Sequence, residues 1–403
     1  MGGPPAVTAA PAADVLHRPG SPGYRRLNVA MVLAGLAAFG LLYAAQPVLP
    51  QLADEFGVRA SLASLAVSAT TGALAIAVLP AAVVARRWGR ARTMRWGLVA
   101  SVVLTLGVAV APTFGSLVVL RALSGLTLAA VAGVAMAHVG AEVHPAGLGS
   151  AMGLYVAGNS LGGVGGRLVT SFVSDGTSWR WGVAAVALAG AAATAAFWRT
   201  LPATVARPPV AASERERVRP PWPLLVLVLV PFTLMGGFVA VYNYLGFRLS
   251  HAPFDLAPAV LGLVFLAYLA GTFSSAVAGR AADRLGRPRV LTASVLVMAG
   301  GLALTLPDVL WLVVAGLVVL TAGFFAAHAV ASGWAPVVAG AASSLGSALY
   351  VTAYYAGSSV FGLWIGEAWT GAGWPGVVVS VALLCAAGLV AGVVVAVGRR
   401  SAR

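Results

Sequence analysis

Charged residues are scarce in this 403-residue chain: they make up only 9% of it, whereas 60% of the residues are hydrophobic. A soluble protein is about 25% charged and cannot bury so much apolar surface. This scarcity excludes a water-soluble enzyme, a nucleic-acid-binding domain, a coiled coil and a disordered chain. Lysine is absent, so that all 25 basic residues are arginine, which we attribute to coding bias. The composition predicts an all-α polytopic membrane protein.

Cysteine occurs once, as Cys385 within a hydrophobic run. A single cysteine excludes a disulfide within the chain and a metal site built from several cysteines. The H-E-x-x-H spacing of zinc enzymes is absent too. We therefore expect no metal, no cofactor and no catalytic residue, and no nucleic acid among the partners.

The chain is rich in long apolar runs. Each is long enough to cross ~30 Å of hydrocarbon as a helix, and none alternates as a membrane strand would. The twelve runs fall at about 27–50, 62–85, 94–112, 115–141, 147–172, 180–201, 223–248, 257–279, 289–306, 309–338, 344–368 and 374–397.

The longest polar segment after the N-terminal tail, 202–222, separates six runs from six. It predicts a cytoplasmic linker between two six-helix bundles, 27–201 and 223–397, flanked by cytoplasmic tails at 1–26 and 398–403. The first tail has no signal-peptide pattern, since no apolar stretch with a cleavage site follows a basic start.

Arginine placement supports an inner location for both termini. With the N-terminus inside, most arginines fall in inner segments, which is the positive-inside bias of membrane proteins. The exceptions lie in outer loops or within spans and are Arg59, Arg121, Arg167, Arg180 and Arg248.

The two halves of the sequence resemble each other at matched points. Residues 86–92 align with 283–289, and 148–151 with 345–348, at the same offset of 197, while 133–138 align with 323–328. A duplicated bundle predicts a mid-membrane cavity between the halves and motion of one half against the other.

At these motifs the sequence resembles the major facilitator superfamily. Gly279 and the run Asp283-Arg284-Leu285-Gly286-Arg287 match its loop signature G-x-x-x-D-R-x-G-R, and Arg121 to Gly125 resemble its fourth-span arginine motif. Residues 46–50, 158–168, 324–328 and 354–357 look like one bacterial subgroup, the YnfM-like inner-membrane exporters. The resemblance implies a twelve-helix secondary transporter that exports small organic molecules in exchange for protons.

Two positions depart from the family pattern. Arg86 stands where the loop signature of the first half has aspartate. Residues 158–163 resemble the fifth-span motif of the superfamily's antiporters, but Gly163 replaces its usual proline.

Inner-end residues form a candidate conformational latch. Asp283 could meet the start of the fifth span near 147–150, where the helix dipole favours a carboxylate, or the loop could serve as a topology anchor alone. Glu142 could pair with Arg87 or Arg90, or remain solvated. The candidate latch comprises Gly279, Asp283, Arg284, Gly286, Arg287, Arg87, Gly89, Arg90 and Glu142.

Charged and titratable residues within spans are candidates for coupling or for the substrate path. Arg121 should face the cavity or an acidic partner, or else snorkel to the outer headgroups. Arg167 and Glu367 could form an outer gate or lie at headgroup level. His138 and His328 could carry a proton or be neutral and hydrogen-bonded. His328 is the better candidate because it lies deep in its span, whereas His138 lies nearer the inner end, and it could substitute for the acid that is not expected at mid-membrane.

Polar and aromatic residues within spans could line the cavity or bond neighbouring helices. An aromatic cavity with almost no acid favours a neutral or amphipathic substrate over a strong cation. Glycines 149, 153, 158, 162 and 166 predict close helix packing. The candidate lining residues are Gln46, Tyr155, Asn159, Tyr242, Asn243, Tyr244, Tyr354 and Tyr355.

The sequence thus favours proton-coupled export of a small organic or drug-like molecule by alternating access, by a monomer in the bacterial inner membrane. A facilitator or importer of a small metabolite is the alternative within the same fold. A polytopic membrane enzyme is a distant alternative, because no convergent acid, base or metal group is apparent.

Overall fold

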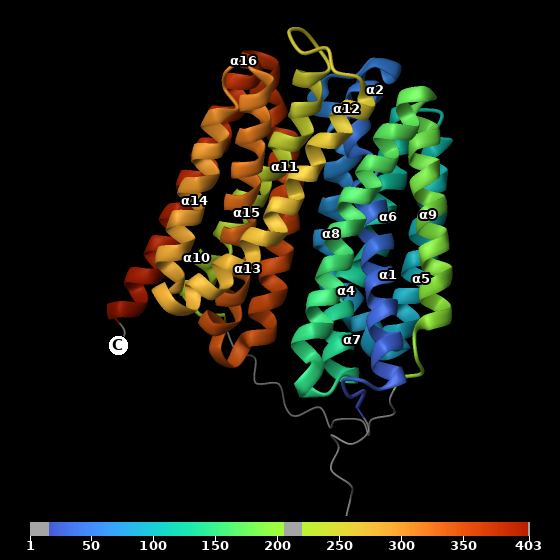
Figure 1. The fold of residues 1–403 in the computed structure, drawn as a ribbon, viewed down its shortest axis with the longest axis vertical. Helices are drawn as coiled ribbons and strands as arrows, with labels where there is room; N and C mark the ends of the chain where they lie inside the picture. The colour runs from blue at the N-terminus through green and yellow to red at the C-terminus, as the bar shows by residue number, and fades with distance from the viewer. Residues whose placement is uncertain (1–15, 205–219, 402–403) are drawn as a thin grey trace, which may run out of the picture.

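The computed structural model describes residues 16–204 and 220–401 and is built from helices joined by short turns (Figure 1). These residues form no strand, although His17 and Val143 make an isolated bridge. Residues 1–15 of the expected tail, 205–219 of the expected linker and 402–403 at the end of the chain lie outside the described residues.

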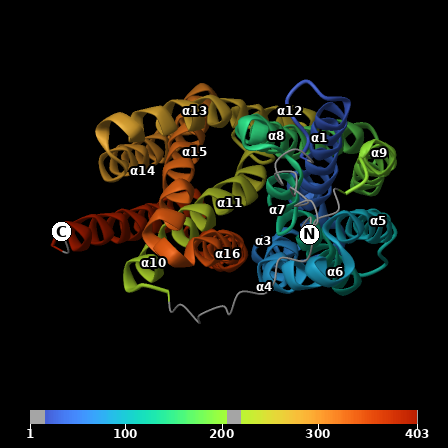
Figure 2. The same ribbon diagram turned by 90° about the horizontal axis from the view of Figure 1, so that it is seen from below.

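The helices gather into two groups that stand side by side (Figures 1 and 2). The first group contains α1 (Pro22–Tyr43), η1 (Gln46–Val48), α2 (Leu49–Phe56), α3 (Ala60–Ala63), α4 (Leu65–Trp88), α5 (Arg90–Ala109), α6 (Phe114–Ala132), α7 (Ala135–Glu142), α8 (Pro145–Gly176) and α9 (Trp179–Thr200). The second contains α10 (Trp222–Leu227), α11 (Leu229–Leu249), α12 (Pro258–Leu263), η2 (Val264–Ala267), α13 (Tyr268–Leu285), α14 (Arg287–Leu304), α15 (Leu310–Ala339), η3 (Gly340–Ala342) and α16 (Ser343–Ser401).

Nine helical stretches of the described residues are long and apolar enough to cross a membrane. The stretch at 345–398 holds two helices, because Gly373 interrupts it with φ +58°. α5 and α8, with 20 and 32 residues, run beside these stretches in the first half. The all-α membrane fold is therefore confirmed, and the count of twelve helices stays a prediction that these additional helices support.

The two arginine-rich loops turn at equivalent glycines. Gly89 has φ +89° and ψ 138°, and Gly286 has φ +87° and ψ 141°, a conformation that side chains with a Cβ rarely adopt. The two loops therefore repeat in structure as well as in sequence. We call the end that carries them the inner end, following the predicted topology.

Glycines bring α8 against α1. A Cβ at Gly158 or Gly162 would overlap the Val32 or Leu36 carbonyl of α1, and one at Gly166 would overlap the backbone of Gly40. Gly149 and Gly153, expected to pack in the same way, instead face open space. The side of α8 that faces inward carries Gly147, Ala151, Tyr155, Gly158, Gly162 and Gly166, whereas Gly149 and Gly153 lie on another, exposed side of the helix.

The halves meet away from the inner end. In the outer part of the bundle α16 packs on α3 and α4, α12 packs on α8, and α11 touches α2. Ser359 Oγ donates to the Ser68 carbonyl at 2.7 Å, and the Ala259 amide donates to Asp175 at 3.3 Å. In Figure 1 the two groups diverge from these contacts towards the inner end.

Candidate functional site

A buried polar cluster joins the two halves at the level where their contacts begin. Gln46 Nε2 donates to Asn243 Oδ1 at 2.7 Å, and Arg167 Nε donates to Gln46 Oε1 at 2.7 Å. Arg167 Nη2 reaches Tyr268 Oη of the second half at 3.2 Å. We call these four residues, Gln46, Arg167, Asn243 and Tyr268, the interface cluster.

Local sequence explains why Gln46 reaches the interface. Pro47 and Pro50 lack a backbone N–H, so α1 ends at Tyr43 and a short 3₁₀ turn carries Gln46 before α2 begins. Gln46 and Asn243 are 2% and 0% exposed. A buried side-chain amide needs hydrogen-bond partners, and Gln46 and Asn243 bond to each other across the two halves.

Aromatic rings surround the guanidinium of Arg167. Its central carbon lies 4.1 Å from the ring centre of Tyr43, 4.7 Å from that of Tyr268 and 5.0 Å from that of Phe265. Such cation–π contacts partly replace the lost hydration of a buried cation.

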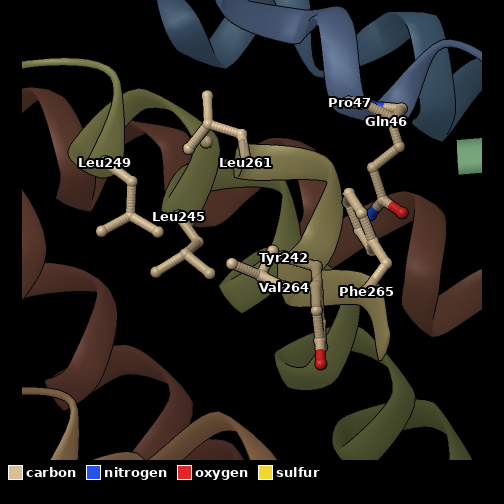
Figure 3. A pocket seen from close by; sticks show the side chains of 9 residues that line it. Gln46, Pro47, Tyr242, Leu245, Leu249, Leu261, Val264 and Phe265 are labelled. Carbon is tan, nitrogen blue, oxygen red and sulfur yellow. The ribbon is translucent and has the colours of Figure 1, made fainter. Parts of the chain in front are cut away.

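A small pocket adjoins the cluster (Figure 3). Three of its lining residues are polar or aromatic, namely Gln46, Tyr242 and Phe265, and the others are aliphatic residues, a proline and a glycine. Its full lining is Gln46, Pro47, Tyr242, Leu245, Gly246, Leu249, Leu261, Val264 and Phe265.

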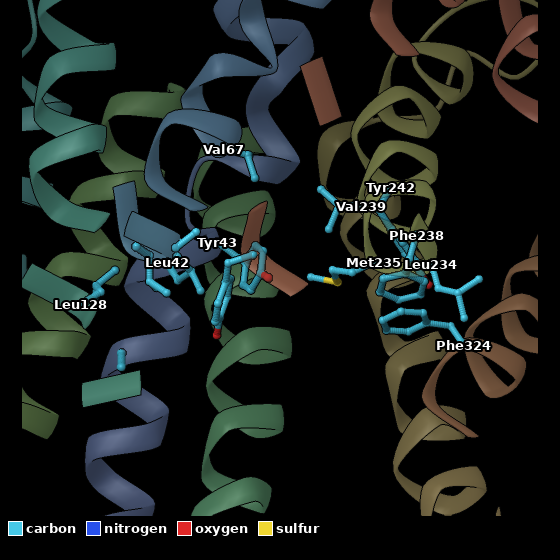
Figure 4. Close-up of a cluster of buried hydrophobic side chains, with 14 of the residues drawn as sticks. Leu42, Tyr43, Val67, Leu128, Leu234, Met235, Phe238, Val239, Tyr242 and Phe324 are labelled. Carbon is cyan, nitrogen blue, oxygen red and sulfur yellow. The ribbon is translucent and has the colours of Figure 1, made fainter. Parts of the chain in front are cut away.

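An aromatic stack continues from this pocket into the second half. Phe238 and Phe324 stack with ring centres 4.0 Å apart, and Phe238 also contacts Tyr242 and Tyr268. Figure 4 shows the stacked pair, with Tyr43 and Met235 pointing toward one another from the two halves.

His328 lies on the same helix as Phe324, one turn further along. Its Nδ1 is 2.9 Å from Tyr350 Oη, and its ring contacts Phe324 and Tyr354. His138 is buried near the inner end, and its Nδ1 has no hydrogen-bond partner among the described residues. The two histidines therefore sit in different surroundings despite their equivalent places in the repeat.

The other predicted lining residues have mixed surroundings. Tyr242 bonds Thr321 Oγ1 at 2.8 Å, and Tyr244 donates to the Gly362 carbonyl at 2.8 Å. Asn159 packs against Gly35 of α1. Tyr155 and Tyr355 are buried, and Tyr354 lies between Tyr355 and His328.

Arg121, suggested to face the cavity or an acidic partner or to snorkel to the headgroups, bonds backbone carbonyls instead. It is fully buried, and its Nε and Nη1 donate to the carbonyls of Ala66 and Leu41 at 2.7 and 2.9 Å, while Nη2 bonds the Leu42 carbonyl. The last carbonyls of a helix lack intrahelical partners and attract a cation. Arg121 thus fixes α6 to the end of α1 and to α4.

Arg167 and Glu367, suggested as an outer gate, do not pair with each other: Arg167 bonds Gln46 and Tyr268. Glu367 instead lies 3.6 Å from Arg59, with both side chains about 60% exposed. Arg167 is only 1% exposed and is enclosed by the protein. Arg248 and Arg180 pair at the outer end with Asp308 and Glu55, each at 2.7 Å.

The latch residues are spread over the inner end. Gly279, Asp283, Arg284 and Arg87 are exposed, and Arg90 and Arg287 are partly so. Glu142 is buried, and its carbonyl accepts from the His17 amide at 2.9 Å. The start of α8, where Asp283 was expected to dock, is covered at Gly147 by Tyr24, whose hydroxyl donates to the Gly147 carbonyl at 3.0 Å.

Sequence reasoning missed Tyr43, Tyr268 and Phe265, the rings around Arg167. Each lies inside an apolar run, where an aromatic residue carries no signal that separates it from the core. Within residues 16–204 and 220–401, no three His, Cys, Asp or Glu side chains are grouped so as to hold a metal ion.

Comparisons with known proteins point in one direction. The sequence pattern of the Major Facilitator Superfamily matches residues 31–266. The chain is 38% identical to the inner membrane transport protein YnfM of Escherichia coli over 93% of this chain and 91% of that protein. It is 34% identical to the MFS-type transporter YybF of Bacillus subtilis over 86% and 87% of the two chains.

Solved structures share the fold at low sequence identity. A bacterial homologue of the human lysosomal transporter Spinster, in an inward-facing and unoccupied conformation, superposes with a TM-score of 0.72 at 15% identity, covering 94% of this chain and 96% of that one. The nucleoside transporter NupG gives 0.70 at 14% identity, covering 92% and 99%. With its two helical halves and this set of relatives, the chain belongs to the Major Facilitator Superfamily of membrane transporters.

Proposed function

We propose that this transporter exports a small organic molecule in exchange for protons by alternating access. In this proposal it lies in the bacterial inner membrane, with both termini in the cytoplasm. The observation that carries the proposal is where the halves touch. Gln46–Asn243, Ser68–Ser359 and Asp175–Ala259 join them towards the outer end, while the charged loops at the inner end are exposed. This arrangement suits a carrier that loads from the cytoplasm.

The substrate path in this proposal follows the interface cluster and the aromatic stack. Ligand sites in transporters of this construction lie between the halves, near the middle of the membrane. Rings and amides are the groups that hold an organic molecule by its faces and polar edges. A pocket lined by Tyr242, Phe265 and Gln46 supports this path.

Proton coupling requires a group that binds and releases a proton within the membrane. Seven acids in the described residues are exposed, and the eighth, Glu142, lies at the inner end. His328 therefore remains our candidate for the proton carrier. Tyr350 and Tyr354 of α16 face it, together with Phe324 of its own helix.

The test of coupling is transport by the purified full chain in liposomes. We expect accumulation of an organic probe to require an imposed pH gradient, and His328→Gln to abolish this dependence while exchange of the probe at equal pH persists. His251→Gln, in an exposed outer loop, is the matched control and should behave as wild type. Equal flux with and without the gradient in the wild-type protein would remove proton coupling.

The alternative is a facilitator or an importer. The direction of transport distinguishes export from import. In inside-out vesicles an exporter accumulates its substrate when the lumen is acidic, because protons leaving the lumen drive the substrate in. Loss of substrate from such vesicles under the same gradient would favour import.

A further inference from the structure

Arg167 differs from the other deeply buried arginines of the chain in its partners. Arg121 bonds three backbone carbonyls, and Arg248 bonds Asp308 together with the carbonyls of 305–307. The carbonyls that Arg121 bonds belong to α1 and α4, and the partners of Arg248 lie in the turn between α14 and α15. Arg167 instead bonds mainly neutral side chains, Gln46 and Tyr268, besides the Gly163 carbonyl of its own helix.

No carboxylate neutralises Arg167 in the described part of the chain. Glu142, the one buried acid there, ends α7 just before α8 begins at Pro145, and Pro145 lies about 33 Å from Arg167 at the rise of an α-helix. Removing a cation from water without a counter-ion is costly, even with aromatic rings around it. The cluster thus carries one uncompensated positive charge.

Hydrogen-bond polarity adds a surplus donor. A guanidinium can only donate, so the oxygen of Gln46 must face Arg167 and its nitrogen must face Asn243. Asn243 must then accept through Oδ1, which leaves its Nδ2 buried and without a partner. A chain of groups that ends in a cation on one side and an unused donor on the other is short of an acceptor, which an anion would supply.

We infer that Arg167 is the charge-recognising residue of the substrate site and that the substrate is a small aromatic monocarboxylate. The guanidinium fork matches a carboxylate with two parallel bonds. Tyr43, Tyr268 and Phe265 offer ring faces beside it, and a single positive charge in apolar surroundings suits a monoanion. The inference rests on the proposed transport function and names its substrate class.

Binding at this site would also act on the contact between the halves. A carboxylate that takes Arg167 Nη2 displaces Tyr268, and one that takes Nε releases Gln46, whose other bond holds Asn243. Occupancy therefore exchanges bonds that tie the outer ends together for bonds to the substrate. A ligand shifts a two-state equilibrium only through such differential contacts.

The test measures binding of benzoate, salicylate and phenylacetate to the purified full chain in detergent, with the neutral amide of each as its control. We expect the carboxylates to bind and to raise Tm, and the amides to do neither. Arg167→Gln should weaken carboxylate binding at least about tenfold, as expected for the loss of charged hydrogen bonds. Arg59→Gln removes the same charge from the exposed outer pair and should leave binding unchanged.

A second variant keeps the test valid if Arg167→Gln does not fold. Gln46→Glu is isosteric and places a carboxylate where the arginine already has a bond. We expect it to raise the Tm of the ligand-free protein and to abolish the response to all three carboxylates. The inference falls if none of the three binds wild-type protein, if the amides bind equally well, or if either variant retains wild-type affinity.

The two proposals fail in different ways. If a pH gradient drives flux of a neutral probe but no carboxylate binds, the substrate class is wrong and proton-driven export stands. If carboxylates bind through Arg167 but no gradient moves them, the site stands and the transport mechanism is wrong.

Discussion

Gln46 and Asn243 are hydrogen-bonded at 2.7 Å and lie 197 residues apart, the same offset that relates the two arginine-rich loops. They are therefore equivalent positions of the internal repeat. Equivalent residues can touch only where they lie next to the axis that relates the two halves. This bond marks the point at which that axis passes through the contact between the bundles.

We expect Asn243→Leu to loosen the outer contact. The loss of one buried hydrogen bond is worth about 1 kcal/mol, which changes a population roughly five-fold. Spin labels at Arg59→Cys and Glu367→Cys, in a Cys385→Ala background, should report longer distances between the halves. Tyr242→Phe, which removes a bond to Thr321 inside the second half, is the matched control. Unchanged distances in Asn243→Leu would show that the bond does not hold the outer end.

Arg121→Met should destabilise the protein rather than alter its substrate preference. The carbonyls of Ala66, Leu41 and Leu42 would lose a charged donor, which should lower the free energy of unfolding by about 3 kcal/mol. Thermal denaturation in detergent measures the effect. Arg59→Met, at an exposed ion pair, should cost less than about 1 kcal/mol. A stable but transport-dead Arg121→Met would instead place Arg121 in the transport path.

Gly162→Ala and Gly153→Ala test the packing of α8. The methyl group at 162 would overlap the Leu36 carbonyl, and forcing it in should cost about 1–3 kcal/mol. The methyl group at 153 meets open space, so this helical site should be unchanged or slightly more stable. We expect Gly162→Ala to melt at a lower temperature than Gly153→Ala. Equal melting temperatures would contradict close packing at 162.

Asp283→Asn addresses the inner latch. Asp283 is exposed while the halves touch at their outer ends, so its carboxylate can gain a partner only when the inner ends approach. Loss of this carboxylate should therefore favour the arrangement seen here. Spin labels on the two arginine-rich loops should then show a larger share of long distances. Asp54→Asn, exposed at the outer end, should leave the distribution unchanged. If Asp283→Asn leaves the distance distribution unchanged, the loop acts as a topology anchor alone.

Much of the fold followed from local pattern. The apolar runs predict the long helices, and the polar segment at 202–222 separates the halves, because a backbone in lipid must satisfy its hydrogen bonds within a helix. The repeat of the loops was also readable, since a turn with positive φ needs glycine at 89 and at 286.

The roles of the buried arginines could not be predicted from the local sequence pattern. Arg121 meets carbonyls 55 to 80 residues away, and those of Leu41 and Leu42 are free because α1 ends at Tyr43. The outer pair of Glu367 with Arg59 joins residues from different halves in the same manner. Sequence spacing alone gives no measure of such distances.

The amino-acid sequence by itself determined that this chain crosses a membrane as helices in two related halves, because burial in lipid dictates length, composition and hydrogen bonding segment by segment. Only the tertiary structure decided which polar groups share a site. Whether Arg167 meets Glu367 or Gln46 depends on how helices far apart in the chain are rotated and tilted against each other, and this is fixed by packing over the whole molecule.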